Sequence, residues 1–373
     1  MSKPYPVVSV VVPVFNRLKL LKATVESLMS QTLMESEFLL VDDNSQSEVW
    51  EYLQRLPQID QRFKVLRKPE HLARGCQTSR NLGLSLVRST FVMFLDSDDL
   101  LSPDCLESRA AFMLDQPDVD IAVGNQAVFH DASGEGYWVN IPDNTQDDID
   151  RFLALAMPID VPWVNAGCLI RMSSLKVAGV QWRESFHWDD VVFHVDCLLA
   201  KLKPGWMPRS VVPDAWYRLH GEEHYGATLM SAEGLENTSR MFTFLIEQLQ
   251  ARQLLSSVKL SLLRRSFFHC CLLRAVDQEL WALVAAMLEK ARASEIYSSR
   301  EVRHLRRFAH ARRMVVRFPR LRFQINRWVR RRSLQQYFCS PESTYCSIPV
   351  TPSSLLTIAP FDIQTTKSSY VRE

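Results

Sequence analysis

Hydrophobic residues in the first 130 positions form short runs that alternate with longer amphipathic segments. Three runs rich in Val, Leu and Phe, at residues 7–12, 38–41 and 91–95, predict strands buried on both faces. Between them, apolar residues recur every three or four positions, which predicts helices. The helices are expected at residues 18–29, 49–56 and 78–87, with further strands at 63–66 and 120–129. This alternation predicts an α/β fold with a mostly parallel sheet flanked by helices.

The run at 91–95 ends abruptly in three acids, Asp96, Asp98 and Asp99. Burying an unpaired carboxylate is costly, so we expect these acids at the carboxyl end of the strand, where open α/β sheets bind ligands. Crowded carboxylates repel one another, and a hard cation such as Mn²⁺ or Mg²⁺ relieves that repulsion. The alternative is a turn in which Asp99 or Ser102 caps the next helix.

Charge is distributed unevenly along the 373 residues, of which 47% are hydrophobic. Residues 1–225 carry 21 Lys+Arg and 31 Asp+Glu, a net charge of −10, whereas residues 226–373 carry 23 and 11, a net charge of +12. The length suits one large domain with a smaller appendage. An acidic part joined to a basic part suggests two separate tasks.

The eight cysteines are scattered, and none forms a C-x-x-C pair. This spacing argues against a zinc site and a disulfide framework, and it favours reduced thiols in the cytosol. The N-terminus lacks a signal-peptide pattern, and no apolar stretch approaches the roughly 20 residues of a spanning helix. We therefore expect a cytoplasmic protein, either free or peripheral at the inner face of the membrane.

Four short motifs stand within the first hundred residues. They are Ser-Val-Val-Val-Pro-Val-Phe-Asn at 9–16, Leu-Val-Asp-Asp-Asn-Ser at 40–45, Arg-Asn-Leu-Gly at 80–83 and Leu-Asp-Ser-Asp-Asp at 95–99. These motifs resemble those of the family 2 glycosyltransferases of the GT-A fold. Each is weak alone, but together they keep the order and spacing of the family. The resemblance implies a metal-dependent, inverting hexosyltransferase. Its donor would be a nucleotide-diphosphate sugar, above all a UDP-sugar, and its acceptor a glycan or lipid-linked hydroxyl in surface polysaccharide or glycolipid assembly.

The first two motifs imply nucleotide-binding residues. Asp43 matches the family acid that accepts the N–H of the base, although an Asx-turn that caps the next helix is a rival role. Pro13, Phe15 and Asn16 are similar to the family loop that packs on the base and ribose.

The other two motifs supply Arg80 and the acids. A guanidinium matches phosphate geometry, so Arg80 is expected to contact the diphosphate or to brace the acids, with a surface salt bridge as the alternative. By the resemblance, Asp98 binds the sugar nucleotide and the metal, Asp99 is a second metal ligand, and Asp96 supports both.

Asp189 and Asp190 precede an apolar helix and resemble the acidic pair of the family, whose second member is the general base. The resemblance therefore makes Asp190 the base and Asp189 its catalytic neighbour, although acids are also common at any helix start. Family members often carry Arg six residues after the base, where this chain has Asp196. We expect Arg183 or Arg218 to supply the missing contact.

The run Trp-Tyr-Arg-Leu-His at 216–220 resembles a family element that closes over the nucleotide. It makes His220 the candidate third metal ligand, with His224 as a rival and an ordinary hydrogen-bonded histidine as the alternative. In another family strand, Gly167 would let the backbone approach the donor sugar. Tryptophans in or near the loops are candidates for stacking on sugars, although core packing is the commoner fate of Trp. They are Trp138, Trp163 and Trp182.

The last third of the chain has a different character. Residues 235–290 are helical by pattern, and residues 300–332 carry thirteen arginines and no lysine, interleaved with residues such as Leu305, Phe308 and Trp328. This pattern favours binding to an anionic membrane surface, with a solvated helical face and nucleic-acid binding as alternatives.

These patterns predict three parts. Residues 1–230 form the GT-A domain and residues 231–335 a helical region that ends in the arginine-rich stretch. Residues 336–373 form a Ser/Thr/Pro-rich flexible tail. Two other functions stay open from the residues: a non-catalytic scaffold or sugar-nucleotide sensor with this fold, and an arginine-rich nucleic-acid-binding protein. The four motifs favour the enzyme.

Overall fold

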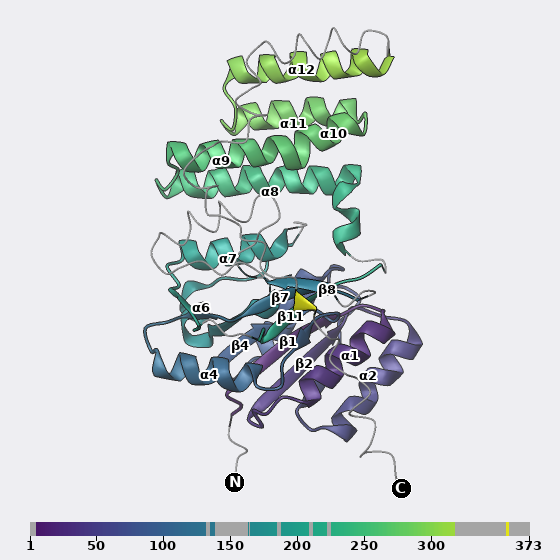
Figure 1. The fold of residues 1–373 in the computed structure, drawn as a ribbon, viewed down its shortest axis with the longest axis vertical. Helices are drawn as coiled ribbons and strands as arrows, with labels where there is room; N and C mark the ends of the chain where they lie inside the picture. The colour runs from purple at the N-terminus through teal and green to yellow at the C-terminus, as the bar shows by residue number, and fades with distance from the viewer. Residues whose placement is uncertain are drawn as a thin grey trace.

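A seven-stranded sheet with helices on both faces forms the lower part of the molecule, and a stack of helices rises above it (Figure 1). The structure is a computed structural model. The residues that it describes are 5–131, 135–138, 163, 165–184, 188–208, 212–221, 225–317 and 356–357.

The strand order in the main sheet is β10-β6-β9-β4-β1-β2-β3. Only β9 runs antiparallel to its neighbours β4 and β6, and the other pairs are parallel. The strand bounds are β1 Val8–Val14, β2 Ser36–Asp42, β3 Phe63–Arg67, β4 Phe91–Phe94, β6 Ile121–Val123, β9 Cys168–Arg171 and β10 Pro204–Trp206. The predicted α/β class with a mostly parallel sheet is confirmed.

The central strands are buried on both faces, as their apolar runs predict. Alternate residues of β1 enter two separate cores: Val11 faces one, and Val10 and Val12 face the other. Helices α1, α2 and α4 cover one face, whereas α3, α6 and α7 cover the opposite face. The helix bounds are α1 Leu18–Met29, α2 Ser47–Ile59, α3 Cys76–Leu86, α4 Cys105–Asp115, α6 Met172–Ala178 and α7 Asp189–Leu199.

Two strand boundaries differ from the prediction. β1 continues through Pro13, which we expected to end it, because β4 pairs with β1 only as far as Val11 and a missing N–H beyond that point breaks no bond to β4. The single strand predicted at 120–129 is two strands, β6 and β7 (Gln126–His130), which belong to different sheets.

A second, five-stranded sheet has the order β12-β8-β7-β11-β5. Its other strands are β5 Leu100–Leu101, β8 Glu135–Trp138, β11 Ala215–Leu219 and β12 Leu356–Thr357. β11 pairs antiparallel with β5, which directly follows the acidic motif. This pairing carries residues 215–220 to the acids at the end of β4.

The helical extension consists of α8 Ala232–Ala251, α9 Ser257–Phe267, a π-helical turn Phe268–Leu272, α10 Leu273–Asp277, α11 Trp281–Ala293 and α12 Ser299–Arg317. The predicted helical character of 235–290 is confirmed. One continuous core runs from Val11 in the sheet through Phe193 of α7 to Phe308 of α12. The extension is therefore packed on the α7 side of the sheet.

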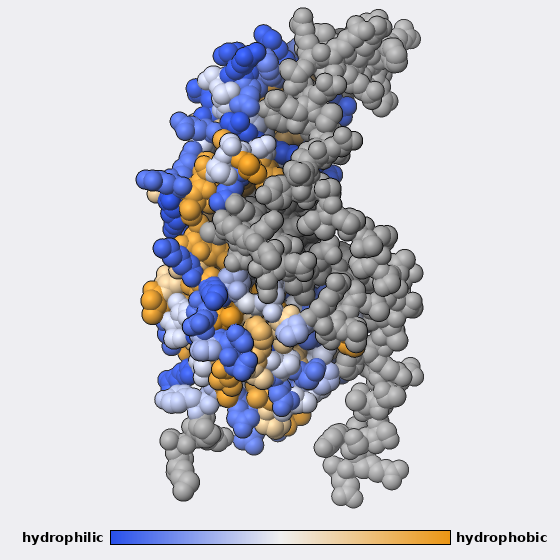
Figure 2. Space-filling model, turned by 60° about the vertical axis from the view of Figure 1, so that its left-hand side comes forward, coloured by the Kyte–Doolittle hydropathy of each residue, from blue (hydrophilic) through white to orange (hydrophobic). Residues whose placement is uncertain are grey.

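The apolar side of α12 is inside the protein. Val302, Leu305 and Phe308 are at most 3% exposed, whereas most arginines of this helix face outward. Accordingly, the coloured side chains at the upper left of Figure 2 are mostly hydrophilic. Leu305 and Phe308 therefore contact protein and not lipid, which the amphipathic pattern alone did not reveal. Residues 318–332 lie outside the described residues.

Two further findings concern possible membrane spans and the cysteines. Within the described part of the chain, no helix is long and apolar enough to span a bilayer. The six cysteines that lie there are all free thiols.

Candidate active site

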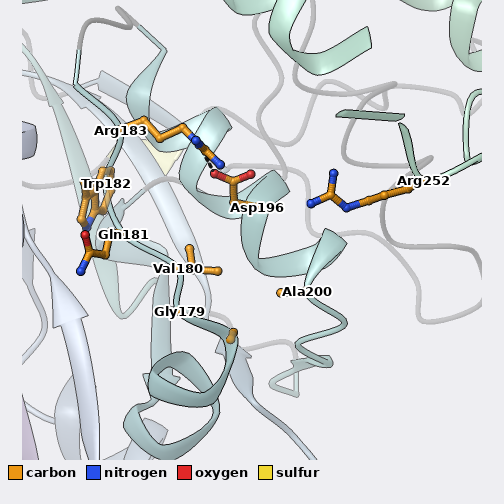
Figure 3. Close-up of a pocket in the computed structure, with 9 residues that line it drawn as sticks. Gly179, Val180, Gln181, Trp182, Arg183, Asp196, Ala200 and Arg252 are labelled. Atoms are coloured by element: carbon orange, nitrogen blue, oxygen red, sulfur yellow. Dashed lines mark hydrogen bonds and ion pairs between the residues drawn. The ribbon is translucent and has the colours of Figure 1, made fainter. Parts of the chain in front are cut away.

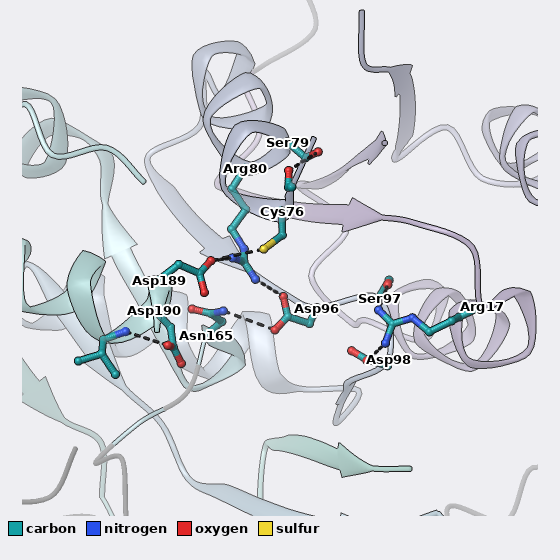
Figure 4. A network of polar contacts seen from close by, with 12 residues as sticks. Arg17, Cys76, Ser79, Arg80, Asp96, Ser97, Asp98, Asn165, Asp189 and Asp190 are labelled. Atoms are coloured by element: carbon teal, nitrogen blue, oxygen red, sulfur yellow. Dashed lines mark hydrogen bonds and ion pairs between the residues drawn. The ribbon is translucent and has the colours of Figure 1, made fainter. Parts of the chain in front are cut away.

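The candidate site lies at the carboxyl ends of β1, β2 and β4. These strands are adjacent and parallel, so the loops that follow them meet at one edge of the sheet. The loop after β4 is a tight turn in which the Asp99 N–H donates to the Asp96 carbonyl at 3.2 Å. Figure 4 shows the side chains that this edge brings together.

Arg80 is the centre of the network. It is buried at 3% exposure in α3, and it donates through Nη1 to Asp189 Oδ2 and through Nη2 to Asp96 Oδ1 (Figure 4). Its guanidinium also lies over the Trp182 ring at 4.3 Å. A surface salt bridge is therefore the wrong interpretation of Arg80, and of the two other predicted roles the structure favours bracing the acids.

The two acids at the start of α7 have different surroundings. Asp189 is bound to Arg80, and the Cys76 thiol contacts its Oδ2 at 3.4 Å. Asp190 is partly exposed, and its Oδ1 accepts from the Val191 N–H at 2.8 Å. Burial, followed by the Asp189 charge, raises the pKa of Asp190 to about 7. A carboxylate with that pKa can exchange a proton near neutrality.

The acids after β4 each have a distinct partner. Asp96 Oδ2 accepts from Asn165 Nδ2 at 3.4 Å, within the 3-10 turn Asn165–Gly167. Asp98 Oδ2 lies 2.5 Å from Arg17 Nη1 and 3.0 Å from His220 Nε2.

Asp99 is buried, and its Oδ1 accepts from the Arg218 N–H at 3.0 Å. Burial, with the charges of Asp98 and Asp96, raises its pKa well above the usual range. The β11 backbone therefore fixes the third acid of the motif.

Asp43 is not the cap of its own turn. Its Oδ2 accepts from the Gly75 N–H at 2.8 Å, and its Oδ1 lies 2.5 Å from Nζ of the buried Lys68. Asp42 takes the turn role instead, since its Oδ1 accepts from the Ser45 N–H at 3.1 Å. The rival Asx-turn role for Asp43 is thus contradicted.

In the loop after β1, an exposed phenyl ring lies close to a proline that is buried in the strand. Phe15 is 47% exposed, whereas Pro13 is buried within the strand. Asn16 links this loop to the loop after β2: its N–H donates to Ser45 Oγ, and its Oδ1 accepts from the Gln46 N–H, both at 2.9 Å. The three predicted loop residues thus occupy the same edge as Asp43.

The residues around Asp98 fit a divalent cation that keeps other ligands. Among the described residues, no three His, Cys, Asp or Glu side chains are arranged as a complete metal site. Asp98 and His220 do converge, and Asp99 Oδ2 is buried without a hydrogen-bond partner in the described part of the chain. Carboxylate with few further protein ligands suits Mg²⁺ or Mn²⁺, which retain waters and substrate phosphates. His224, the rival ligand, lies outside the described residues.

Three expectations about supporting residues are wrong. Trp163 and Trp182 are core residues at 1% and 2% exposure, and Trp182 stacks on Phe193 at 4.2 Å, so neither is available to a sugar. A Cβ on Gly167 would lie 2.0–2.1 Å from the Gln126 amide, so this glycine makes room for Gln126 rather than for the donor. The Trp138 side chain lies outside the described residues.

Neither predicted substitute for the family arginine reaches the acids through its guanidinium. Arg183 pairs with Asp196 at 2.6 Å on the outer side of α7, and Arg218 pairs with Asp131 at 2.8 Å. The guanidinium that does reach Asp98 belongs to Arg17, which we had not predicted. Its position directly after the first motif, in the loop between β1 and α1, was the available signal.

Tyr217 and Lys68 were also missed. Burial, and then the carboxylates of Asp99, Asp96, Asp98 and Asp190, raise the pKa of the Tyr217 phenol, which places it among the acids. Lys68 was not predicted because it follows β3, which lies next to β2 at the same edge of the sheet. Tyr217 stands within the predicted closing element, but nothing in its spacing distinguished it.

Two hollows in the described surface lie away from the acid network. One, of about 360 Å³, lies against Trp182, Arg183, Asp196 and Arg252 (Figure 3). The other, of about 280 Å³, lies between α3 and α6. Neither is lined by the predicted base or nucleotide-binding residues.

Comparison with known proteins agrees with this geometry. The chain matches the family described as Glycosyl transferase family 2 over residues 9–170, and Glycosyl transferase family group 2 over residues 91–287, which is more than half of its length. It therefore belongs to the family 2 glycosyltransferases, as the four motifs indicated.

Several similar curated proteins are glycosyltransferases of bacteria. The putative glycosyltransferase EpsH of Bacillus subtilis is 30% identical over 220 residues, 58% of this chain and 61% of that protein. The putative teichuronic acid biosynthesis glycosyltransferase TuaG of B. subtilis is 31% identical over 144 residues, 38% and 56% of the two chains. Glycosyltransferase GlyG of Streptococcus pneumoniae is 29% identical over 131 residues, 35% and 42%. The chain thus spans about half the length of these relatives.

Among solved structures, residues 1–349 of S. aureus TarS in complex with UDP-GlcNAc align with a TM-score of 0.60 at 18% identity. The alignment covers 82% of this chain and 87% of that one. At this identity the likeness shows a shared fold, which is that of the GT-A glycosyltransferases.

The raised pKa of Asp190 predicts a pH-dependent stability. Between the ordinary value of 3.8 and about 7, the folded state holds a proton that the unfolded state has released. The contribution of Asp190 to the free energy of unfolding should therefore fall as pH rises through this window. Asp190→Asn removes the effect, so its stability relative to the native protein should increase from pH 4 to pH 8 in urea unfolding. The exposed Asp115→Asn variant should track the native protein, and a pH-independent difference for Asp190→Asn would contradict the assignment.

Proposed function

We propose that this chain is an inverting glycosyltransferase that moves a sugar from a nucleotide-diphosphate donor to an acceptor hydroxyl. One observation carries the proposal. Arg80 joins the acidic motif after β4 to the acidic pair of α7, and it leaves Asp190 outside the ion pairs that hold Asp96 and Asp189. Arg80 thereby fixes the proposed donor site and the proposed general base relative to each other.

Asp43, Phe15, Pro13 and Asn16 are the proposed nucleotide site. Asp43 Oδ2 accepts from the Gly75 N–H, and Oδ1 makes an ion pair with Lys68 but accepts no hydrogen bond from the described residues. Each oxygen therefore keeps a lone pair for the N–H of a base such as uracil. The exposed Phe15 ring offers an apolar surface for the base or ribose. TarS, which shares the fold, was solved with UDP-GlcNAc and with UDP, and this supports a UDP-sugar as the donor.

Asp98, Asp99 and His220 are the proposed ligands for Mn²⁺ or Mg²⁺. When bound, the cation would stabilise the negative charge of the departing diphosphate. Asp98 and His220 are already 3.0 Å apart, and Asp99 is fixed behind them by the Arg218 N–H. Asp96 holds the loop in place through Arg80 and Asn165.

Asp190 is the proposed general base. Its pKa of about 7 lets it accept a proton from the acceptor hydroxyl at neutral pH. The hydroxyl oxygen then attacks the anomeric carbon from the side opposite the diphosphate. The new carbon–oxygen bond forms as the bond to phosphate breaks, so the anomeric configuration inverts. Asp189 fixes the start of α7 through Arg80 and keeps Asp190 in position.

The acceptor is proposed to be a glycan or lipid-linked glycan in surface polysaccharide or glycolipid assembly. The name of TuaG, a putative teichuronic acid biosynthesis glycosyltransferase, supports this class. In this proposal residues 1–230 perform the transfer, residues 231–335 form a helical region that positions the protein, and residues 336–373 are a tail.

The exposed side of α12 supports an electrostatic contact with an anionic membrane. Arg300, Arg303 and Arg307 recur at helical spacing and are exposed, while the apolar side of the helix is packed inside. We therefore propose that the protein is cytoplasmic and associates with the inner face of the membrane through charge rather than through insertion.

The base assignment predicts a separation of binding from chemistry. UDP-sugars with Mn²⁺ should raise the thermal stability of the native protein and of Asp190→Asn alike, because the base does not hold the donor. Release of UDP from that donor should be roughly 10²- to 10⁴-fold slower in Asp190→Asn. For the native protein, the rate should rise with pH and level off above about 7.

Asp196→Asn is the matched control, since Asp196 lies on the same helix but pairs with Arg183. It should keep the native rate within a few-fold. Equal rates in native and Asp190→Asn would contradict the base. Donor binding by a native protein that never releases UDP would favour a non-catalytic sensor.

The α12 proposal predicts salt-sensitive vesicle binding. Full-length protein should sediment with anionic vesicles at about 50 mM salt and stay in the supernatant at about 500 mM, because salt screens exposed charges. The triple variant Arg300→Gln, Arg303→Gln, Arg307→Gln should stay in the supernatant at both concentrations.

Removing three exposed charges elsewhere, with Arg55→Gln, Lys176→Gln and Lys203→Gln, should leave sedimentation unchanged. Equal sedimentation of both triple variants would contradict a role for α12. Tighter binding to RNA than to vesicles would favour the nucleic-acid alternative.

A further inference from the structure

Arg17 has an unusual backbone and an unusual partner. It precedes α1 as the N-cap residue, yet it adopts the left-handed conformation with φ 55° and ψ 48°, and its side chain makes no capping hydrogen bond. Asn16 before it also has φ 55°. Two consecutive non-glycine residues in this region are costly, and such strain is typical of functional loops.

This backbone directs the Arg17 side chain at the acidic motif. Its Nη1 lies 2.5 Å from Asp98 Oδ2, and its Nη2 lies 3.5 Å from Ser97 Oγ (Figure 4). Unlike the buried Arg80, the Arg17 side chain is 23% exposed, so it has room to move. A preferred N-cap residue such as Asn or Ser would stabilise the helix better but would place no charge here.

The Asp98 oxygen that Arg17 contacts has a second partner. The same Oδ2 also contacts His220 Nε2 at 3.0 Å. A carboxylate oxygen has two lone pairs in its plane. Arg17 takes one, and His220 takes the other in the tautomer whose proton is on Nε2. A divalent cation at this oxygen therefore needs one of the two groups to leave. Arg17 carries a permanent positive charge, which a cation repels, whereas a neutral imidazole can itself bind the metal.

We propose that Arg17 exchanges partners during donor binding. Without ligands it neutralises Asp98 in place of the metal, and when the metal and donor occupy the site it leaves Asp98 and binds the donor diphosphate. A guanidinium suits both partners, since it forms charge-assisted hydrogen bonds to carboxylate and to phosphate. Metal binding and diphosphate binding are thereby coupled through one side chain. The inference rests on the proposed function.

The test uses Arg17→Asn in the full-length protein, because Asn tolerates the left-handed conformation and is a good N-cap residue. Without nucleotide, Mn²⁺ should bind the variant at least threefold more tightly than the native protein, as measured by electron paramagnetic resonance of free Mn²⁺. In saturating Mn²⁺, UDP should bind the variant roughly tenfold more weakly, in line with the loss of a charge-assisted hydrogen bond. Uridine, which lacks the diphosphate, should bind both proteins equally.

Arg17→Gly should behave like Arg17→Asn, and Arg17→Lys should lie between the variant and the native protein. Arg55→Asn, which removes an exposed arginine of α2, should change neither affinity. Thermal unfolding of each variant without ligands checks that the fold is kept.

The Mn²⁺ affinity and the UDP affinity test different parts of the proposal. Weaker UDP binding without tighter Mn²⁺ binding would make Arg17 a fixed diphosphate ligand and overturn the exchange. Tighter Mn²⁺ binding with unchanged UDP binding would overturn the transfer to the diphosphate. A native protein that binds no UDP would instead refute the proposed function.

Discussion

The site depends on one buried guanidinium held between two carboxylates. Arg80 has almost no access to water, and its charge is compensated by Asp96 from the loop after β4 and by Asp189 from the start of α7. Removing one partner of such a group leaves an uncompensated buried charge, which is costly. The two acidic segments, far apart in the sequence, are therefore fixed relative to each other. The Trp182 ring packs against the Arg80 guanidinium and helps to hold it in place.

This bridge also explains how neighbouring acids acquire different properties. Asp189 and Asp190 are adjacent, but among the described residues the first makes an ion pair with Arg80, whereas the second accepts from the backbone N–H of Val191. Burial and the neighbouring charge then raise the pKa of Asp190 toward neutrality. A comparable division separates Asp99, which accepts from the β11 backbone, from Asp98, whose partners are the side chains of Arg17 and His220. In each pair one acid is buried and the other is partly exposed.

Much of the framework could be predicted from the sequence because it depends on local patterns. Apolar runs and helical spacing gave the order of the elements around the main sheet, and acids at strand ends gave the edge that carries the site. What failed depends on contacts distant in sequence. Whether Trp182 meets a sugar or Arg80, and whether Phe308 meets lipid or helices, is decided by packing partners that periodicity does not reveal. Arg17 was missed because its side chain reaches the acids through a left-handed backbone conformation, which the residue pattern does not predict.

A crystal structure with UDP and Mn²⁺ tests the central claim most directly, because manganese can be located by its anomalous scattering. The account predicts a manganese peak at coordination distance from Asp98, with the base of the nucleotide beside Asp43 and Arg80 still between Asp96 and Asp189. A nucleotide bound in the hollow beside Arg183, with no manganese at the acids, would contradict it.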